Sequence, residues 1–449
     1  MYNTTFKKLH YVEDMQLAYD AFPDERYVGF MDYSTPVILV RDPQLSKQIT
    51  IKDFDHFCNR RELFAQEVNP LLVKSLLFLR GDKWREMRTT LTPAFTGSKM
   101  KLIFPIMVEN SNNIVKYLLD NQSKNIDVED LSHRSGLDVI ASSGFGLQIN
   151  SLVDRDNEFF TVVSNLANIS IKKMALIALT STCLEQTKKL GVSYFQSNIH
   201  NFFINIVASA VEYRKRENVE RADMLQLLME TKKEWSLEDL TAQVFFFCFA
   251  GLDTSSTTVS MAIHELALHP EIQERVYQEC RQVAEDKEIT YESLNELKYL
   301  DCVINETLRK WTAGIYMDRT CMKTYQLPPS SEGARPYTLK PGDLVYCPIN
   351  VIHKDANYWP DPDKFDPERF SEENKHNIKP FTFVPFGEGP RRCIAMRFAL
   401  MEIKTFLFYI ILNFKIVKTE KTTDPLKLNP HYFSVKALKG SFVKFQKRE

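Results

Sequence analysis

A single cysteine near the C-terminus is the residue most suited to chemistry in this 449-residue chain. Cys393 ends a Gly/Pro-rich loop, PFGEGPRRC, and an apolar helical run from Met396 to about Phe414 follows it. Glycines in such a loop let backbone N–H groups turn toward the sulfur, and the positive end of the next helix favours an anion. Arg391 and Arg392 add positive charge nearby. The pattern therefore predicts a thiolate, which serves as a metal ligand or a nucleophile.

The sequence around Cys393 narrows the chemistry of that thiolate. Neither a Cys-x-x-Cys pair nor a nearby histidine accompanies it, so the partners of a tetrahedral zinc site are missing from the sequence. One axial thiolate ligand to a haem iron fits the pattern better. The alternative is a buried cysteine in an ordinary loop-to-helix turn.

The spacing Phe386-x-x-Gly389-x-Arg391-x-Cys393 resembles the haem-ligand signature of the cytochrome P450 monooxygenases. The resemblance implies haem b as the cofactor and Cys393 as its metal ligand, with Phe386 and Arg391 among the cofactor-binding residues. The chain departs from the signature at Ala395, where glycine is usual. Many relatives tolerate one methyl group there, so ligation is still expected.

Basic and aromatic residues elsewhere are expected to hold the anionic edge of the cofactor. The sequence Trp84-x-x-x-Arg88 places an indole and a guanidinium on one helix face, within reach of one anion. The resemblance assigns this pair and Arg319 to a haem propionate, and it adds Arg60 to the cofactor-binding set. In isolation, a tryptophan packed over an arginine stem would be the simpler interpretation.

A long helix is predicted to lie over this site. Its capping box begins at Ser236, and the apolar sequence that follows indicates a central, buried helix to about His269. The AGLDTS segment in its middle is unusual for a buried helix: Thr254 can bond a carbonyl one turn back, glycine leaves room for a small ligand, and Asp253 can shuttle protons. The resemblance makes this segment the oxygen-binding groove, with Ala250 beside the cofactor and Asp253 and Thr254 catalytic. A kink used only for packing is the alternative.

Other motifs are expected to shape the fold. Glu306 and Arg309 share one face of a helix that starts near Tyr299, and by resemblance they form a buried structural lock that Arg369 completes. His353 is expected to be structural and not a metal ligand.

The substrate cavity is expected to be apolar and lined by aromatic residues. Many relatives have proline where Thr312 and Ala313 stand, so the wall at this point departs from the family. The residues expected to line the cavity or touch substrate are Phe245, Phe249, Ile315, Tyr316 and the segment His431-Tyr432-Phe433, in a hairpin predicted over Leu426 to Phe445.

The resemblance implies a mainly α protein with small β-sheets, an α+β class in which residues 27–449 form a single haem-thiolate domain. A hairpin is predicted from Tyr27 to Val40, with a helix to about Lys52 after it. A net charge of −1 gives no global field for nucleic acid, which we exclude as a partner. Eight cysteines without paired spacing indicate a reduced compartment.

The N-terminal segment 1–26 lacks the anchor helix and the proline-rich hinge of the microsomal relatives, since no apolar run reaches the ~18 residues of a membrane span. We therefore expect a truncated, fragmentary or processed form. The stretch from about 101 to 230 is helical by period. Its apolar segments 174–184 and 202–211 fit a membrane surface or the core, and we favour the core. Arg214-Lys215-Arg216 is predicted to be a solvated face.

The four motifs occur in family order, and the segments 250–257 and 359–401 resemble the insect microsomal branch, near its ninth family. The resemblance implies a monooxygenase that inserts one oxygen atom of O2 into apolar small molecules such as plant toxins, insecticides or endogenous lipids. Its electrons would come from NADPH through a flavoprotein reductase, with cytochrome b5 as a further partner, at the cytoplasmic face of the endoplasmic reticulum membrane. Lys99, Arg392 and Arg397 are candidate reductase contacts. The alternatives are a reductase-independent isomerase or dehydratase on the same scaffold, and a non-catalytic haem binder.

Overall fold

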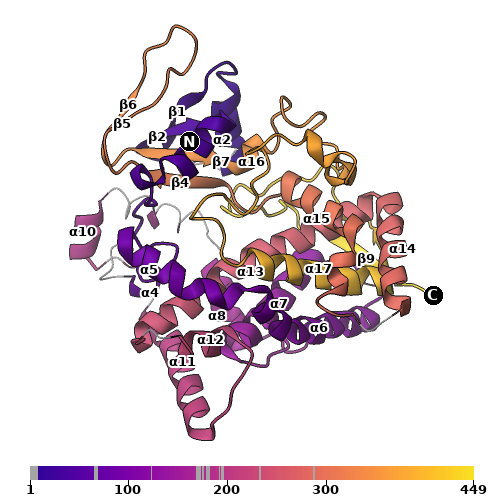
Figure 1. Ribbon diagram of the computed structural model, residues 1–449. Coiled ribbons are helices and arrows are strands. Elements are labelled where there is room, and N and C mark those ends of the chain that lie inside the picture. Colours follow the sequence, from indigo (N-terminus) through magenta and orange to yellow (C-terminus); the bar gives the residue numbers. More distant parts are fainter. Residues whose placement is uncertain are drawn as a thin grey trace.

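The computed structural model describes residues 9–64, 69–122, 124–167, 173, 176–177, 183–191, 193, 197–231, 234–286 and 289–449. Helices form most of the molecule and small sheets the rest, which confirms the predicted mainly α architecture with small β-sheets (Figure 1). The helix α13 (Leu237–Leu268) runs through the middle, and most of its side chains are buried. It begins as predicted, because the Ser236 hydroxyl accepts a hydrogen bond from the Asp239 N–H at 3.1 Å.

Helices surround α13 because nearly its whole circumference is apolar at the middle. Those packed directly against it are α4 (Pro70–Val73), α7 (Val128–Ile140), α8 (Glu158–Ala167), α11 (Ser197–Glu217), α12 (Met224–Met229), α14 (Pro270–Asp286), α15 (Lys298–Lys310) and α17 (Met396–Asn413). The other α-helices within the described residues are α2 (Tyr11–Asp20), α3 (Pro43–Lys47), α5 (Gly81–Leu91), α6 (Gly97–Asp120), α10 (Leu184–Lys189) and α16 (Ile349–Ile352).

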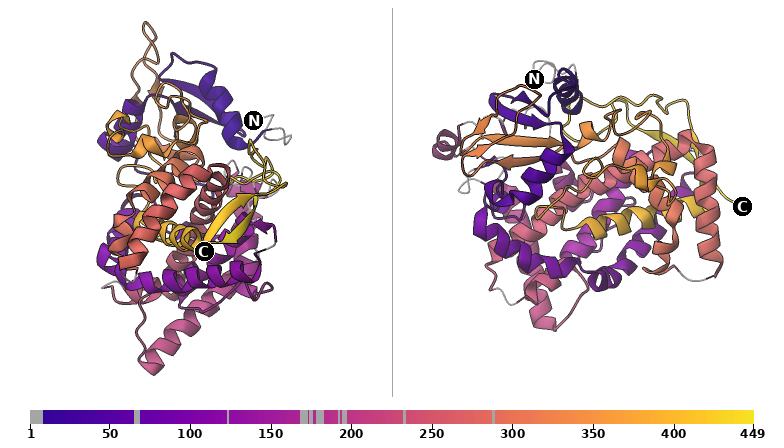
Figure 2. Two further views of the ribbon diagram at one scale, coloured as in Figure 1. Left: turned by 90° about the vertical axis from the view of Figure 1, so that its right-hand side faces the viewer. Right: turned by 45° about the horizontal axis from the view of Figure 1, so that its top comes forward.

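A four-stranded sheet lies beside the N-terminus, apart from the helical layer (Figure 2). The predicted N-terminal hairpin is confirmed as β1 (Tyr27–Asp32) and β2 (Thr35–Val40), which pair antiparallel. The strand β7 (Leu344–Pro348) runs parallel to β2 and antiparallel to β4 (Tyr316–Thr320). The helix predicted after the hairpin is α3, continued by a π-helical turn over Gln48–Lys52. This sheet positions the segment 312–319, which enters the site.

The C-terminal hairpin prediction is partly wrong. The strand β9 (Phe442–Lys447) pairs with β8 (Phe414–Lys418), which follows α17 directly, and with β3 (Ile126–Asp127). Between 426 and 442 only the isolated bridge of Leu428 with Ala437 resembles the expected hairpin. The strand β6 (Thr338–Leu339) pairs with β5 (Tyr325–Gln326) in a separate two-stranded sheet. The pairing of β9 with β8 and β3 joins segments that are far apart in the sequence. The local sequence pattern therefore could not predict it.

The predicted lock on α15 is present and buried. The Arg309 Nε lies 2.7 Å from the Glu306 Oε2, and both side chains are fully buried. The Arg369 Nε approaches the Glu306 Oε1 at 3.5 Å. His353 is structural, as expected, because its Nε2 accepts a hydrogen bond from the Val384 N–H at 2.9 Å. Burial lowers the pKa of His353 to about 3, so its ring is neutral.

The prediction of a solvated face at residues 214–216 is wrong for Arg214. Its guanidinium is buried and makes a bidentate pair with Asp223, with Nη1 to Oδ1 at 2.8 Å and Nη2 to Oδ2 at 2.6 Å. Lys215 and Arg216 are exposed. On the same helix Phe203 and Val207 are buried, which confirms the core assignment for this part of segment 202–211. The segment 174–184 lies largely outside the described residues.

Candidate functional site

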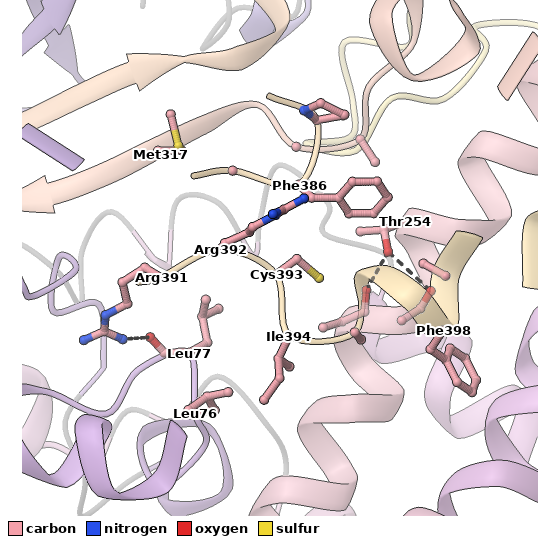
Figure 3. A pocket seen from close by; sticks show the side chains of 18 of the residues that line it. Leu76, Leu77, Thr254, Met317, Phe386, Arg391, Arg392, Cys393, Ile394 and Phe398 are labelled. Carbon is pink, nitrogen blue, oxygen red and sulfur yellow. Dashed lines mark hydrogen bonds between the residues drawn. The ribbon is translucent and has the colours of Figure 1, made fainter. Parts of the chain in front are cut away.

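A cavity of about 460 Å³ lies between α13 and the cysteine loop. Most of its lining is apolar, but one thiol and several guanidinium groups border it (Figure 3). The structure brings together nearly the whole predicted site here. The predicted site residues that line the cavity are Arg60, Trp84, Arg88, Ala250, Thr254, Arg319, Phe386, Arg391 and Cys393.

The cysteine loop holds its shape through glycine backbone conformations. Gly387 and Gly389 both have positive φ, at 69° and 75°, which side chains disfavour. A Cβ on Gly389 would lie 2.2 Å from the Thr50 carbonyl oxygen, so this position requires glycine. The Cys393 N–H donates to the Phe386 carbonyl at 2.9 Å and closes the loop. The loop is therefore fixed against the π-helical turn that contains Thr50, and it aims the sulfur into the cavity.

The surroundings of Cys393 act on its thiol in both directions. Burial raises the pKa of the Cys393 thiol, although the Ala395 N–H and the charges of Arg88, Arg60 and Arg392 oppose it. The loop N–H and the arginines act in the predicted direction, but desolvation outweighs them. A metal ion that binds the sulfur removes the proton, so the raised pKa does not argue against ligation.

Arg391 is turned away from the cysteine. Its guanidinium donates to the carbonyl oxygens of Cys58, at 3.0 Å, and Leu79, at 2.9 Å. It also lies 4.0 Å from the centre of the Trp84 ring. Figure 3 shows this side chain reaching toward Leu77. Arg391 thus ties the cysteine loop to the segment before α5.

The arginines of the cavity carry more positive charge than their protein partners neutralise. Arg60 pairs with Asp318 at 2.8 Å, whereas the fully buried Arg319 donates to the backbone carbonyl of Asp318. Burial and the neighbouring Arg60 lower the pKa of Arg319 to about 10. Burial, with Arg60 and Arg319, lowers the pKa of Arg391 to about 9. Among the described residues, the Nε atoms of Arg60 and Arg319 have no hydrogen-bond partner. Such a rim calls for an anionic ligand.

Above the cavity, α13 contributes a stripe of small residues. The Thr254 hydroxyl donates to the Ala250 carbonyl at 3.1 Å, as predicted, and is exposed to the cavity (Figure 3). Gly251 lines the cavity, as expected, and it has a second role in packing. A Cβ on this residue would lie 3.1 Å from the Ile140 Cδ1, so the glycine permits close packing of α13 on α7.

Asp253 lies outside the cavity lining. Its Oδ1 is 3.3 Å from the His133 Nε2 on α7. Burial alone would raise the pKa of Asp253, but His133 and Lys436 outweigh burial and hold it below its ordinary value. Asp253 is therefore a carboxylate at neutral pH, directed at α7 and not at the cavity.

Comparison with known proteins decides the family. The cytochrome P450 family model matches residues 10–443. Over 98% of this chain and 89% of the relative, the sequence is 37% identical to cytochrome P450 9e2 of Blattella germanica. It is 38% identical to the probable cytochrome P450 9f2 of Drosophila melanogaster, over 94% of this chain and 87% of the relative. The probable cytochrome P450 6a13 of Drosophila melanogaster is 37% identical, with 94% and 86% covered.

The chain belongs to the cytochrome P450 family. Several relatives are insect members of the ninth family, as the segments 250–257 and 359–401 indicated. Membership makes the protein a haem-thiolate monooxygenase.

The residues of the cavity fit the haem of a cytochrome P450. An apolar cavity suits the macrocycle, and the surplus guanidinium charge of Arg60, Arg88 and Arg319 suits its two propionates. Cys393 is the cysteine in the lining whose sulfur can reach an iron. This fit is inferred from the chemistry of the thiol and the guanidinium groups in the lining. Membership of the cytochrome P450 family explains why these groups lie together.

The substrate side of this cytochrome P450 differs from the expectation in four residues, because Phe245, Phe249, His431 and Tyr432 do not line the cavity. Ile315 and Tyr316 line the cavity as predicted, and Phe433 joins them from the C-terminal segment. Phe245 and Phe249 do not; they stack on each other with ring centroids 6.0 Å apart. Their places are taken by Phe246 and Phe247.

The wall at Thr312 and Ala313 is held without proline. The Asn350 side chain donates to the Thr312 carbonyl at 2.9 Å and to the Gly314 carbonyl at 3.2 Å. Both Thr312 and Ala313 line the cavity. One buried amide thus fixes the strand entry that proline stiffens in many relatives.

Sequence reasoning missed Ser255 and Thr258 as lining residues. The cavity-facing positions of α13 include 250, 251, 254, 255 and 258, which share one helical face. This spacing could be read from the sequence. It also shows that position 253 does not lie on the cavity-facing side of α13.

Proposed function

We propose that this monooxygenase acts on apolar small molecules and takes its electrons from NADPH through a flavoprotein reductase. The observation that carries the proposal is the placing of the Cys393 sulfur and the Thr254 hydroxyl in one arginine-rimmed, apolar cavity. Haem bound there supplies the oxygen-activating redox chemistry. Cys393 would bind its iron through the sulfur, and Arg60, Arg88, Arg319 and Trp84 would hold its anionic edge.

The apolar lining would bind the substrate and exclude bulk water. Aromatic side chains of Phe246, Phe247, Tyr316 and Phe433 favour hydrophobic or aromatic compounds, which include plant toxins, insecticides and lipids. Thr254 would hold a proton at its hydroxyl oxygen, and Asp253 would relay protons from the surface near His133.

The reductase, cytochrome b5 and the endoplasmic reticulum membrane are the partners we propose from the family. Arg397 is exposed at the start of α17, and Arg392 borders the same loop, where an acidic partner could approach. Large apolar side chains are exposed at Leu17 and Phe22, which suits contact with the membrane surface at its cytoplasmic face. Within the part of the chain that the structure describes, no helix combines the length and the apolar character needed to cross a bilayer.

One experiment separates the candidate activities. The purified protein with added reductase should consume NADPH and O2 and convert a fraction of an apolar substrate panel into products with one added oxygen atom. Turnover of a hydroperoxide without NADPH would instead indicate the isomerase or dehydratase, and an inert protein with a thiolate haem spectrum would indicate a haem binder.

Thr254→Ala should uncouple this activity. Product per NADPH should fall roughly tenfold, below the ~10²–10⁴ of a direct acid–base group, because water can replace part of the lost hydroxyl. Hydrogen peroxide release should rise correspondingly, as measured by a peroxide assay beside NADPH consumption. Thr258→Ala is the matched control on the same helix face, and equal coupling in both variants would contradict a special role for Thr254.

A further inference from the structure

Phe433 reaches the cavity wall from a segment that has no strand or helix of its own. The residue lies between β8 and β9, where the chain forms turns and isolated bridges. Backbone groups that make no continuous ladder need hydrogen-bond partners from other parts of the molecule. The position of Phe433 in the wall therefore depends on the residues packed around it.

The start of α2, which packs beside the four-stranded sheet, binds this segment (Figure 1). His10 is fully buried, and its Nε2 donates a hydrogen bond to the Ser434 carbonyl at 3.2 Å. The other ring nitrogen, Nδ1, accepts a hydrogen bond from the Val12 N–H at 3.2 Å and caps the helix, so the proton of the neutral ring is on Nε2. One imidazole thus joins the beginning of α2 to the residue that follows Phe433.

Tyr11 adds an aromatic contact from the first turn of α2. Its ring centroid lies 5.4 Å from that of Phe433 and 6.1 Å from that of Tyr316. The rings of Phe433 and Tyr316 are 6.4 Å apart and nearly perpendicular, and both residues line the cavity. Tyr11 is buried and does not line it. The three residues therefore form a ring triangle, with two members in the cavity wall and Tyr11 behind them.

Hydrogen bonds fix the supporting ring of Tyr11. Its hydroxyl donates to Oδ1 of the buried Asp32 at 3.1 Å. The other oxygen of Asp32 accepts hydrogen bonds from Arg61, at 2.6 Å, and from the Tyr346 hydroxyl, at 2.8 Å. Tyr346 stacks on Tyr316, with ring centroids 4.1 Å apart and planes 8° from parallel. A buried carboxylate with partners on both oxygens makes such a cluster rigid, so α2 and the sheet hold the rings in one arrangement.

We propose that His10 and Tyr11 are positioning residues for the substrate, which hold Phe433 against Tyr316 and thereby fix the shape of one wall of the cavity. The helix α2 then acts on specificity without touching the substrate. Because an aromatic wall gains affinity from close contact, a displaced Phe433 weakens the binding of small aromatic molecules. The inference deepens the proposed function and rests on it, because the molecule that this wall selects is the substrate.

Absorption titrations of the oxidised holoenzyme with 4-phenylimidazole and with imidazole test the proposal. Both compounds bind a haem iron through nitrogen, but only the phenyl group has to fit against the wall, so the ratio of the two Kd values reports on the wall. Tyr11→Leu should raise this ratio roughly three- to tenfold, the range expected for one lost aromatic contact. His10→Asn should raise it roughly two- to fivefold, because asparagine still caps α2 but is too short to reach Ser434.

Tyr19→Leu is the matched control. Tyr19 is a buried tyrosine of the same helix, outside the ring triangle, and its hydroxyl donates to Asp355 at 2.8 Å. This variant should keep the wild-type ratio. Tyr11→Phe keeps the ring but not its hydrogen bond, so it should fall between the wild type and Tyr11→Leu. In a Phe433→Leu background, Tyr11→Leu should change the ratio by less than about twofold, because the ring through which it acts is already absent.

A wild-type ratio in both Tyr11→Leu and His10→Asn, or an equal change in Tyr19→Leu, would overturn the proposal. If Tyr11→Leu does not fold, the ratio in His10→Asn decides. Turnover of an apolar substrate gives a second readout, in which KM should rise more than kcat falls, because the wall acts on binding. A wild type that binds both azoles but forms no product identifies failure of the proposed function, while the ratio still tests the role of α2.

Discussion

Cys393→Ser is expected to abolish the long-wavelength Soret band of the reduced, carbon-monoxide-bound protein together with its monooxygenase activity. A serine hydroxyl does not ionise near neutral pH, so it would not supply the anionic sulfur ligand that a haem-thiolate enzyme requires of its protein. The loss of activity should exceed the ~10- to 100-fold that removing an outer partner of a metal ligand costs. Absorption spectra of the reduced protein with carbon monoxide, and product formation with NADPH and reductase, measure both effects.

The matched control is Cys183→Ser. Cys183 is a partly buried cysteine before α10 and does not line the cavity. This variant should keep the wild-type spectrum and turnover. A Cys393→Ser protein with an unchanged Soret band and unchanged product formation would refute the assignment of Cys393 as the ligand.

The sequence allowed prediction of those site residues whose role depends on short spacing. Phe386 and Cys393 lie in one loop, and Trp84 and Arg88 lie one turn apart on α5, so local geometry brings each pair to the cavity. The long helix over the site was predictable for the same reason, because its cap and its apolar middle are local features.

Residues whose surroundings were not predictable share a different property: their partners are distant, or the direction of their side chain depends on helical phase. Asp253 was grouped with Thr254 by adjacency, although neighbouring helical residues point about 100° apart and only Thr254 faces the cavity. Arg214 was predicted to be solvated because it belongs to a run of three basic residues, and its partner Asp223, beyond the end of α11, was not foreseen.

Glu402 carried a signal that the sequence analysis did not use. It is an acid within an apolar helical run, which is a costly placement without a function or a partner. What the sequence could not provide was its neighbour, since Ser255 is on a different helix. The unusual placement of an acid was therefore visible in the sequence, whereas its burial follows from the packing of α17 against α13.

Arg309→Ala is expected to destabilise the protein by roughly 3–5 kcal/mol, because it leaves a buried carboxylate without its main partner. The carboxylate oxygens of Glu306 accept hydrogen bonds from Nε and Nη2 of Arg309, at 2.7 and 2.8 Å. The same guanidinium donates to the His353 carbonyl at 2.9 Å and the Pro362 carbonyl at 2.7 Å, so its loss also leaves these acceptors unpaired. Urea titration of the holoenzyme, followed by tryptophan fluorescence and by the Soret band, measures the change.

A pair with the same helical spacing on the surface separates burial from charge. Arg85 meets Asp82 at 3.1 Å, also three residues apart, but the two side chains are 50% and 95% exposed. Arg85→Ala should therefore cost less than ~1 kcal/mol. Arg309→Lys keeps the charge but not the two-pronged geometry, so it should fall between the two alanine variants. Equal small losses for Arg309→Ala and Arg85→Ala would show that the buried pair does not hold this side of the fold together, whereas a large loss confined to Arg309 assigns the stability to its enclosed hydrogen bonds.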